Sequence, residues 1–375
     1  MIPLFKVPMS ERVPAAVGAV LTSGQVGQGS KVEEFEAALR ERIGCRYVAT
    51  VNSATAGLQL ALRIAGESPQ GTPRGIDGEV LSTPLTMEAT NWAILAGGSR
   101  IRWVDVDPAT LNVDLDDLAR KISPATRAIM IVHFAGYPVD LPRLTAILDQ
   151  AEGTFGFRPP VIEDCAHAWG ATLDGVPLGN HGNIAVFSFQ AVKHLTCGDG
   201  GVMVLPNREW HHRAKLLRWF GIDRAADRLV TAPDVMEWGL KFHMTDINAA
   251  IGLANLEQAD AVLRRHRENA AFYDRRLATV PGLEQTERLP GRESSFWVYP
   301  LLVENREAFM KHMRDAGITV SQVHPRNDRH SCVREFVSLL PGMDRVDERL
   351  VCIPVGWWVS DEDRQFVVDT IRAGW

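Results

Sequence analysis

The chain has 375 residues with a formal net charge of −6, and 46% of its residues are hydrophobic. This length can bury a sizeable core and predicts two domains or one large one. Acidic and basic residues are mixed along the whole chain, which argues against a basic surface for nucleic acid. No long apolar run occurs, and Glu11 and Pro14 interrupt the region where a signal peptide would be apolar, so we expect a cytoplasmic protein.

The first half of the chain has the pattern of an α/β fold. From about residue 45 to 205, short apolar runs alternate with helix-like stretches, as in βαβ units around a mainly parallel sheet. The seven expected strands are 47–51, 79–82, 101–104, 128–132, 160–163, 184–188 and 201–204. Apolar residues at helical spacing predict helices at 54–65 and 142–151. Residues 66–78 are rich in Gly and Pro and are expected to form a loop.

The second half predicts a smaller α+β domain. Residues 245–280 are expected to form one or two helices that start at Thr245 and Asp246. The apolar stripe of this region is Ile247, Ile251, Leu253, Leu256 and Leu263. Strands at 295–303 and 350–354 alternate with helices at 306–316 and 361–372. We therefore expect an N-terminal arm and large domain at 1–245, and a linking helix and small domain at 246–375.

The cysteines do not indicate a disulfide framework or a zinc site. There are five of them, and no pair has C-x-x-C spacing. Free thiols are expected at Cys45, Cys165, Cys197, Cys332 and Cys352, and no metal site is predicted.

The segment VIEDCAHAWGA (161–171) ends an apolar strand in two carboxylates. This places Asp164 at the carboxyl edge of the sheet, where α/β proteins bind ligands. Taken alone, Asp164 is equally well a loop residue or a helix cap.

The segment AVFSFQAVKHLTCGDGG (185–201) leads from a strand through Ser188 to Lys193 and a glycine-rich turn. In such an apolar setting, burial would lower the pKa of the lysine, which is what a Schiff-base amine requires. A lone lysine is more often a surface cation, but the strand-end acid before it favours a shared site.

A third segment, VNSATAGLQLAL (51–62), takes a strand through a turn of small residues into a helix. The N–H groups and the dipole at the start of a helix favour a phosphate. Ser53 and Thr55 can equally act as plain N-caps.

Together the three segments resemble the DegT/StrS-type sugar aminotransferases, a pyridoxal-phosphate-dependent family with the aspartate aminotransferase fold (fold type I). The order of the two segments, with the Asp164 segment (161–171) before the Lys193 segment (185–201), is highly specific for this family. The resemblance covers nearly the whole chain and is also carried by SGQVGQGSKVEEFEAAL (23–39), STPLTMEATNWAI (82–94), VDVDPATLNVD (104–114), IVHFAGYPVDL (131–141) and WGLKFHMTDINAAIGLANLE (238–257).

The resemblance implies roles for individual residues. Lys193 would carry the coenzyme as a Schiff base, Asp164 would pair with its pyridine nitrogen, and His167 would contact its phenolic oxygen. A helix-face histidine satisfied by the backbone is the alternative for His167. The phosphate would be held by the start of the helix and the end of the strand, at Ser53, Ala54, Thr55 and Ser188.

Three positions depart from the family pattern. Ala54 replaces the usual glycine of the phosphate turn, which is tolerable only if the local φ is negative. Met87 stands where an aromatic ring often stacks on the coenzyme, and Trp92 is an alternative for that contact. Lys241 replaces the asparagine that reaches the phosphate of the partner subunit in a homodimer. It is either a stronger phosphate contact or an exposed side chain.

Substrate contacts are harder to predict. The loop VHPRNDRHS (323–331) offers His324, Arg326 and Arg329, which either grip a substrate anion or form a solvated charged loop. His243 stands where relatives often have arginine, and its role is open.

The resemblance implies ping-pong transfer of an amino group from an amino acid, expected to be L-glutamate, to a nucleotide-linked keto-deoxysugar. A keto-cyclitol or another small keto metabolite is the alternative acceptor. The dehydratases of the family carry histidine in place of the Schiff-base lysine, so Lys193 argues against that reaction. A coenzyme-binding regulator is disfavoured because no DNA-binding module is appended.

Overall fold

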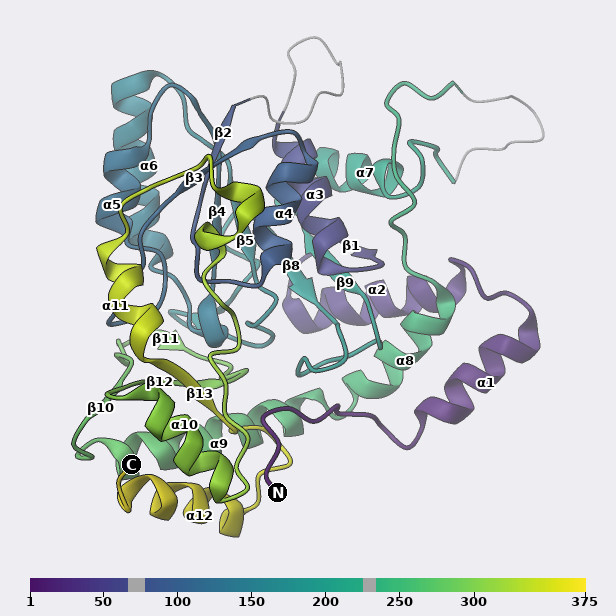
Figure 1. Ribbon diagram of the computed structural model, residues 1–375. Coiled ribbons are helices and arrows are strands. Elements are labelled where there is room, and N and C mark those ends of the chain that lie inside the picture. The colour runs from purple at the N-terminus through teal and green to yellow at the C-terminus, as the bar shows by residue number, and fades with distance from the viewer. Residues whose placement is uncertain (67–77, 225–233) are drawn as a thin grey trace.

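A central sheet of seven strands forms the large part of the computed structural model, which describes residues 1–66, 78–224 and 234–375 (Figure 1). The strands run in the order β1-β9-β8-β5-β4-β2-β3. Their bounds are β1 (Val48–Val51), β2 (Glu79–Ser82), β3 (Arg100–Trp103), β4 (Thr126–Val132), β5 (Val161–Asp164), β8 (Ile184–Ser188) and β9 (Gly201–Val204). Within this sheet β9 is antiparallel to its neighbours and the other pairings are parallel. The expected mainly parallel seven-stranded sheet is confirmed, whereas residues 67–77 of the expected Gly/Pro-rich loop lie outside the described residues.

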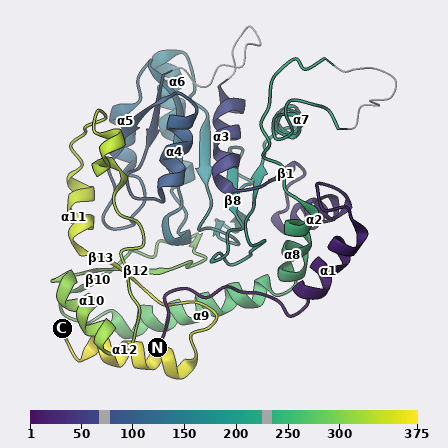
Figure 2. The same cartoon turned by 45° about the vertical axis from the view of Figure 1, so that its right-hand side comes forward.

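Both faces of this sheet are covered by helices (Figures 1 and 2). In β4, Ala128 and Met130 belong to one hydrophobic cluster, whereas Ile129 and Ile131 belong to another. Successive side chains of a strand point to opposite faces, so a sheet buried on both faces needs continuous apolar runs. The first cluster includes residues of α3 (Ala54–Ala65), α4 (Glu88–Ala96) and α7 (Arg208–Leu217), and the second includes residues of α2 (Ser30–Ile43), α5 (Leu115–Lys121) and α6 (Leu141–Phe155).

A smaller antiparallel sheet organises the C-terminal part. It consists of β10 (Leu283–Gln285), β12 (Tyr299–Val303) and β13 (Leu350–Ile353), in that order. Residues of α9 (Ala259–Leu277), α10 (Arg306–Asp315) and α12 (Asp361–Arg372) complete its hydrophobic cluster. A third, short sheet joins β11 (Arg292–Glu293) to β6 (Thr172–Leu173) and β7 (Val176–Pro177). In the part of the chain that the structure describes, no helix is long and apolar enough to cross a membrane.

Of the elements expected in the second half, the helical stretch agrees with the structure and one strand differs from it. The helical stretch 245–280 is divided into α8 (Asp246–Leu256) and α9. The expected strand 295–303 is shorter, because Phe296 has a φ of 50° that interrupts an extended backbone, and β12 begins only at Tyr299.

The apolar stripe expected on α8 packs only in part within the chain, through Leu253 and Leu256. The small residues Ala249, Ala250, Gly252 and Ala254 are buried, whereas Ile247, Ile251, Leu253 and Leu256 are only partly buried. Helix α8 packs against α1 (Val13–Ser23) and α2. A side chain at Gly252 would meet the Phe35 ring at 2.6 Å, so small residues permit this close approach.

Residues on each side of the expected division at residue 245 pack into the part on the other side. The N-terminal Ile2 pairs with Ile318 and belongs to the hydrophobic cluster of the C-terminal part. Conversely, Val333, Met343 and Val346 belong to a cluster of the large domain. Each of the two parts therefore includes segments from the other side of residue 245 in its hydrophobic core.

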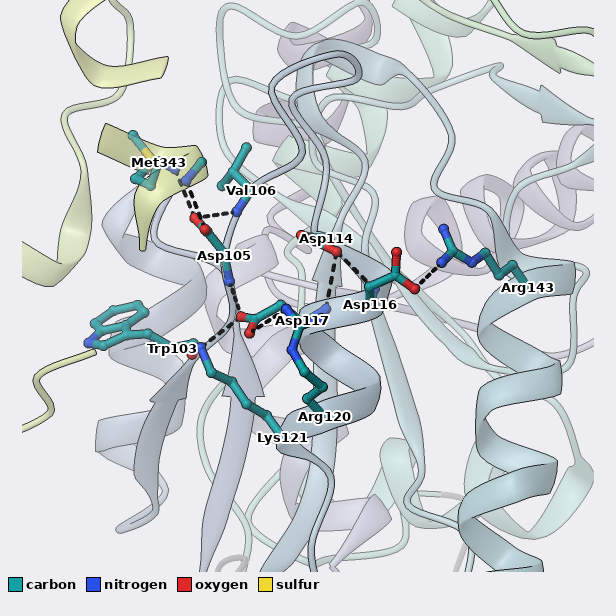
Figure 3. A network of polar contacts seen from close by, with 11 residues as sticks. Trp103, Asp105, Val106, Asp114, Asp116, Asp117, Arg120, Lys121, Arg143 and Met343 are labelled. Carbon is teal, nitrogen blue, oxygen red and sulfur yellow. Dashed lines mark hydrogen bonds and ion pairs between the residues drawn. The ribbon is translucent and has the colours of Figure 1, made fainter. Parts of the chain in front are cut away.

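A buried polar network attaches α11 (Pro341–Arg349) to the end of β3 (Figure 3). The carboxylate of Asp105 accepts hydrogen bonds from the backbone N–H groups of Gly342 and Met343, each at 2.8 Å. Asp117 in turn accepts the backbone N–H of Asp105, and Lys121 donates to Asp117 at 2.7 Å. A carboxylate at the start of a helix satisfies amides that have no partner within the helix. Asp105 thus fixes the C-terminal part against the large domain.

Replacing Asp105 by alanine is expected to lower the free energy of unfolding by roughly 2 kcal/mol, because two buried amides lose a charged acceptor. Urea unfolding followed by circular dichroism measures this loss. Asp116→Ala is the matched control, since the ion pair of Asp116 with Arg143 is exposed and should contribute about 0.5 kcal/mol or less. Equal losses in the two variants would contradict the importance of the Asp105 contact.

Candidate active site

A cavity of about 360 Å³ lies at the carboxyl ends of β5 and β8, beside the start of α3. Parallel neighbouring strands end at the same edge of a sheet, which is where this fold class binds ligands. The predicted residues that line the cavity are Ser53, Ala54, Thr55, Met87, Asp164, His167, Ser188, Lys193 and His324. The structure thus brings together side chains from segments that are far apart in the sequence.

Asp164 is the last residue of β5 and is only 4% exposed. Its two carboxylate oxygens accept hydrogen bonds from the Thr90 hydroxyl at 2.7 Å and from the Ala166 backbone N–H at 3.0 Å. Burial raises the pKa of the carboxyl, and these hydrogen bonds oppose the increase. The Thr86 hydroxyl lies 2.8 Å from that of Thr90 and extends this network.

Lys193 lies in the turn that follows β8, and its backbone N–H donates to Gln190 O at 3.0 Å. Its amine lies over the indole ring of Trp297, 3.5 Å from the ring centroid. Burial lowers the pKa of the amine to about 7, although the nearby charge of Asp164 acts in the opposite direction. A substantial fraction of neutral, nucleophilic amine is therefore present at neutral pH.

His167 is stacked between other rings of the cavity wall. Its ring is 4.0 Å from that of Trp297 at an interplanar angle of 13°, and 5.2 Å from that of His324 at 5°. The two Nε2 atoms of His167 and His324 are 3.3 Å apart. Burial lowers the pKa of both imidazoles, that of His324 to about 3, so both are neutral and one donates to the other.

The start of α3 forms the opposite end of the cavity. Ser53 is the N-cap, and its hydroxyl accepts the backbone N–H of Ala56 at 3.1 Å. Ala54 begins the helix and does not have a positive φ, so alanine is tolerated in place of glycine. A side chain at Gly201 would come within 2.9 Å of Ala54 N, which explains why β9 has a glycine beside this turn.

The cavity also contains residues that sequence reasoning missed. Thr90 of α4 donates a hydrogen bond to the carboxylate of Asp164. Trp297 and Phe5 are far apart in the sequence, and their rings stack with 5.1 Å between the centroids. Thr90 belongs to the segment 82–94, which resembles the family, so this resemblance could have indicated it as a site residue. No local signal in the sequence marks Phe5 or Trp297.

Met87 lies at the cavity just before α4 and is 49% exposed. Trp92, the alternative aromatic residue, does not line the cavity. Its ring instead contacts the edge of His330, with 5.7 Å between the ring centroids.

Four predicted residues do not line the cavity within one chain. Arg326 is buried in ion pairs with Asp328 and Asp344, so its guanidinium is not free to bind a substrate anion. Arg329 is exposed and pairs with Asp347.

The other two lie outside the cavity lining but close to it, because Asn52, the residue before Ser53, donates hydrogen bonds to the backbone oxygens of Lys241 and Phe242. Lys241 has an exposed side chain, and its backbone forms a bridge with Trp219. His243 is buried with its ring at 4.2 Å from that of Trp219, and burial lowers its pKa to about 4.

His133, Glu163 and Cys165 form a buried group whose ligand atoms lie close enough together to hold a metal ion. His133 Nδ1 accepts the backbone N–H of Val139, so Nε2 carries the proton and donates to Glu163 at 3.0 Å. Glu163 also accepts a hydrogen bond from Asn183. These hydrogen bonds account for the group without a metal ion.

A model of the DegT/DnrJ/EryC1/StrS aminotransferase family matches residues 9–372. AtS13 from Actinomadura melliaura is 62% identical to this chain, with a TM-score of 0.96, and covers 100% of this chain and 99% of its own. The sugar aminotransferase CalS13 from Micromonospora echinospora is 58% identical, with a TM-score of 0.96 and complete coverage of both chains. The PLP form of Spr1654 from Streptococcus pneumoniae is 25% identical, with a TM-score of 0.88, over 99% of this chain and 98% of its own.

These similarities confirm the resemblance found in the sequence and the fold type I architecture. The family match spans nearly the whole chain, and the structural matches have the same overall fold. The chain belongs to the DegT/DnrJ/EryC1/StrS family and is a pyridoxal-phosphate-dependent aminotransferase.

Proposed function

We propose that this enzyme moves the amino group of L-glutamate to the keto group of a nucleotide-linked keto-deoxysugar by a ping-pong mechanism. The observation that carries the proposal is the placement of the Lys193 amine and the Asp164 carboxylate in one cavity beside a helix N-terminus. The similarity to the sugar aminotransferase CalS13 supports a sugar acceptor.

The residues of the cavity fit pyridoxal phosphate. Asp164 would hold the pyridine nitrogen in its protonated form, and the start of α3 with Ser188 would bind the phosphate through N–H and hydroxyl donors. His167 lines the same cavity, and its buried Nδ1 has no hydrogen-bond partner among the residues that the structure describes. When bound, the coenzyme would accept the amino group of the donor, and its ring would take up the electron pair that remains when the α-carbon of the donor loses a proton.

Lys193 would first attach the coenzyme and then act as the proton carrier. Its pKa near 7 allows the amine both to take a proton from the donor and to return it at neutral pH. Asp164 stays in place through its hydrogen bonds with Thr90 and Ala166, so it fixes the ring while the proton moves.

His324 is the residue of the loop 323–331 that we propose to contact the acceptor, because it lines the cavity and Arg326 does not. Its neutral imidazole can form hydrogen bonds to sugar hydroxyls or to a carbonyl oxygen. We propose small-molecule substrates only, in a cytoplasmic enzyme.

We also propose that the enzyme is a homodimer in which Lys241 of each subunit contacts the phosphate held by the other. The side chain of Lys241 is exposed and does not line the cavity of its own chain, which is consistent with a role across an interface. Helix α8, which follows closely, has the partly exposed apolar residues Ile247 and Ile251 that a second subunit would cover.

Lys193→Ala is expected to abolish the attachment of the coenzyme that borohydride can reduce, because no other amine lines the cavity within the described residues. The purified wild-type protein should be yellow and should hold the label at Lys193 after reduction, as measured by mass spectrometry. Circular dichroism of the variant should show unchanged folding. A reducible adduct in the folded variant would overturn the assignment of Lys193.

Asp164→Asn is expected to slow the half-reaction with glutamate by roughly a hundredfold or more, because an amide does not keep the ring nitrogen protonated. Stopped-flow absorbance with glutamate alone measures this step without any sugar. Attachment of the coenzyme to Lys193 should persist in the variant and serves as the internal control. A half-reaction at the wild-type rate would remove Asp164 from its proposed role.

Lys241→Ala is expected to raise the dissociation constant of the coenzyme roughly tenfold, through loss of one charge-assisted contact to the phosphate. Equilibrium dialysis measures the dissociation constant. Lys215→Ala is the matched control, because Lys215 is an exposed lysine of α7. Equal affinities in the two variants would show that Lys241 is simply exposed.

A further inference from the structure

Trp297 makes two contacts with the lysine segment at the same time. The amine of Lys193 lies over its ring at 3.5 Å from the centroid. Its indole N–H donates to the carbonyl oxygen of Val192, the residue before the lysine, at 3.0 Å. Trp297 is 4% exposed, whereas Val192 and Lys193 are partly buried, so the ring side of both contacts is shielded from water. One side chain therefore holds both the backbone and the amine of this segment.

The orientation of the indole is fixed by packing. Its ring stacks on His167 at 4.0 Å and on Phe5 at 5.1 Å. Its backbone N–H donates to Ala135 O at 3.0 Å. Because the ring cannot turn without breaking these contacts, it offers the amine a fixed surface.

Among the described residues, few charged groups near the Lys193 amine stabilise its cationic form. Asp164 favours the cationic form of Lys193, whereas burial disfavours it. Burial lowers the pKa of the neighbouring His167, His194 and His324, so they add no positive charge at neutral pH.

Asp199 also lines the cavity and is exposed to solvent. The face of an indole carries partial negative charge and attracts a cation without itself taking up a proton.

We propose that Trp297 is a positioning residue that holds the cationic form of Lys193 whenever this lysine is not bonded to the coenzyme. This inference rests on the proposed function, in which the lysine is released and then carries a proton. A free lysine side chain has many rotamers, and selecting one of them costs conformational entropy. The ring returns the amine to one place beside the cavity in each cycle, with its proton retained until it is transferred.

The test measures the titration of Lys193 in the full-length, coenzyme-free protein. Acetic anhydride reacts with neutral amines, so competitive labelling from about pH 5 to about pH 10, analysed by mass spectrometry, gives the midpoint for each lysine. The wild-type midpoint at Lys193 should lie near 7, because burial lowers its pKa to about 7. The exposed Lys215 provides the reference in the same sample.

Trp297→Leu is expected to lower the Lys193 midpoint by about one pH unit, because a shielded cation loses its aromatic partner. Trp297→Phe should lower it less, since a phenyl ring keeps a weaker face. If Trp297 served only to exclude water, leucine would admit water and the midpoint would rise toward the ordinary value for lysine. A rise or an unchanged midpoint in a folded variant overturns the proposal.

Phe5→Leu is the matched control for packing. It loosens the same wall but keeps the indole, so the midpoint at Lys193 should stay the same or rise. A decrease equal to that of Trp297→Leu would show that the ring contact is not the cause and would overturn the proposal.

A second measurement does not depend on the folding of Trp297→Leu. Protein produced with fluorinated tryptophan keeps the size of the ring but has a weaker negative face, so the Lys193 midpoint should fall. The same replacement in Trp297→Phe should leave the midpoint unchanged, and a fall there would overturn the proposal. Loss of the proposed function would be seen separately, as a reducible coenzyme adduct in Lys193→Ala.

Discussion

The parallel pairing of β5 with β8 is the constraint on which the site depends. In this ladder Asp164 lies opposite Val186, so the carboxylate leaves the sheet at the edge where β8 continues through Ser188 to Lys193. Since helices bury both faces of the sheet, polar side chains gather where its strands end. The carboxylate and the amine therefore come together without being neighbours in the sequence, and the packing that places them also removes them from water.

Removing ionisable groups from water costs free energy, and the site offsets this cost differently for each group. Asp164 is supported by two hydrogen-bond donors. Lys193 has a pKa of about 7 and an aromatic face beside its amine. The imidazoles of His167 and His324 are neutral and form a hydrogen bond to each other. The neutral imidazoles of His167 and His324 therefore do not compete with the carboxylate and the amine for protons.

The sequence was sufficient where the relevant signal is local. The strands of the large sheet followed from short apolar runs, and Asp164 and Lys193 were predicted from their positions at the end of β5 and in the turn after β8. Contacts between distant segments were not predictable. Trp297 is 105 residues from the backbone oxygen that it binds. Arg326 was a candidate either for a substrate contact or for a solvated charged loop, whereas in the structure it is buried and pairs with Asp344 of α11, a carboxylate that no local pattern connects to it.

The loop 323–331 shows how such a distant contact shapes the site. Asn327 is fully buried, and its amide donates to the backbone oxygen of Thr86 at 3.0 Å. The hydroxyl of Thr86 lies beside that of Thr90, which donates to Asp164. One polar network thus connects the loop that presents His324 with the carboxylate at the other side of the cavity. Because a buried polar network tolerates few arrangements, a change in this loop that displaced Asn327 would also disturb the support of Asp164. The loop that carries His324 and the carboxylate of Asp164 are therefore connected through one set of hydrogen bonds.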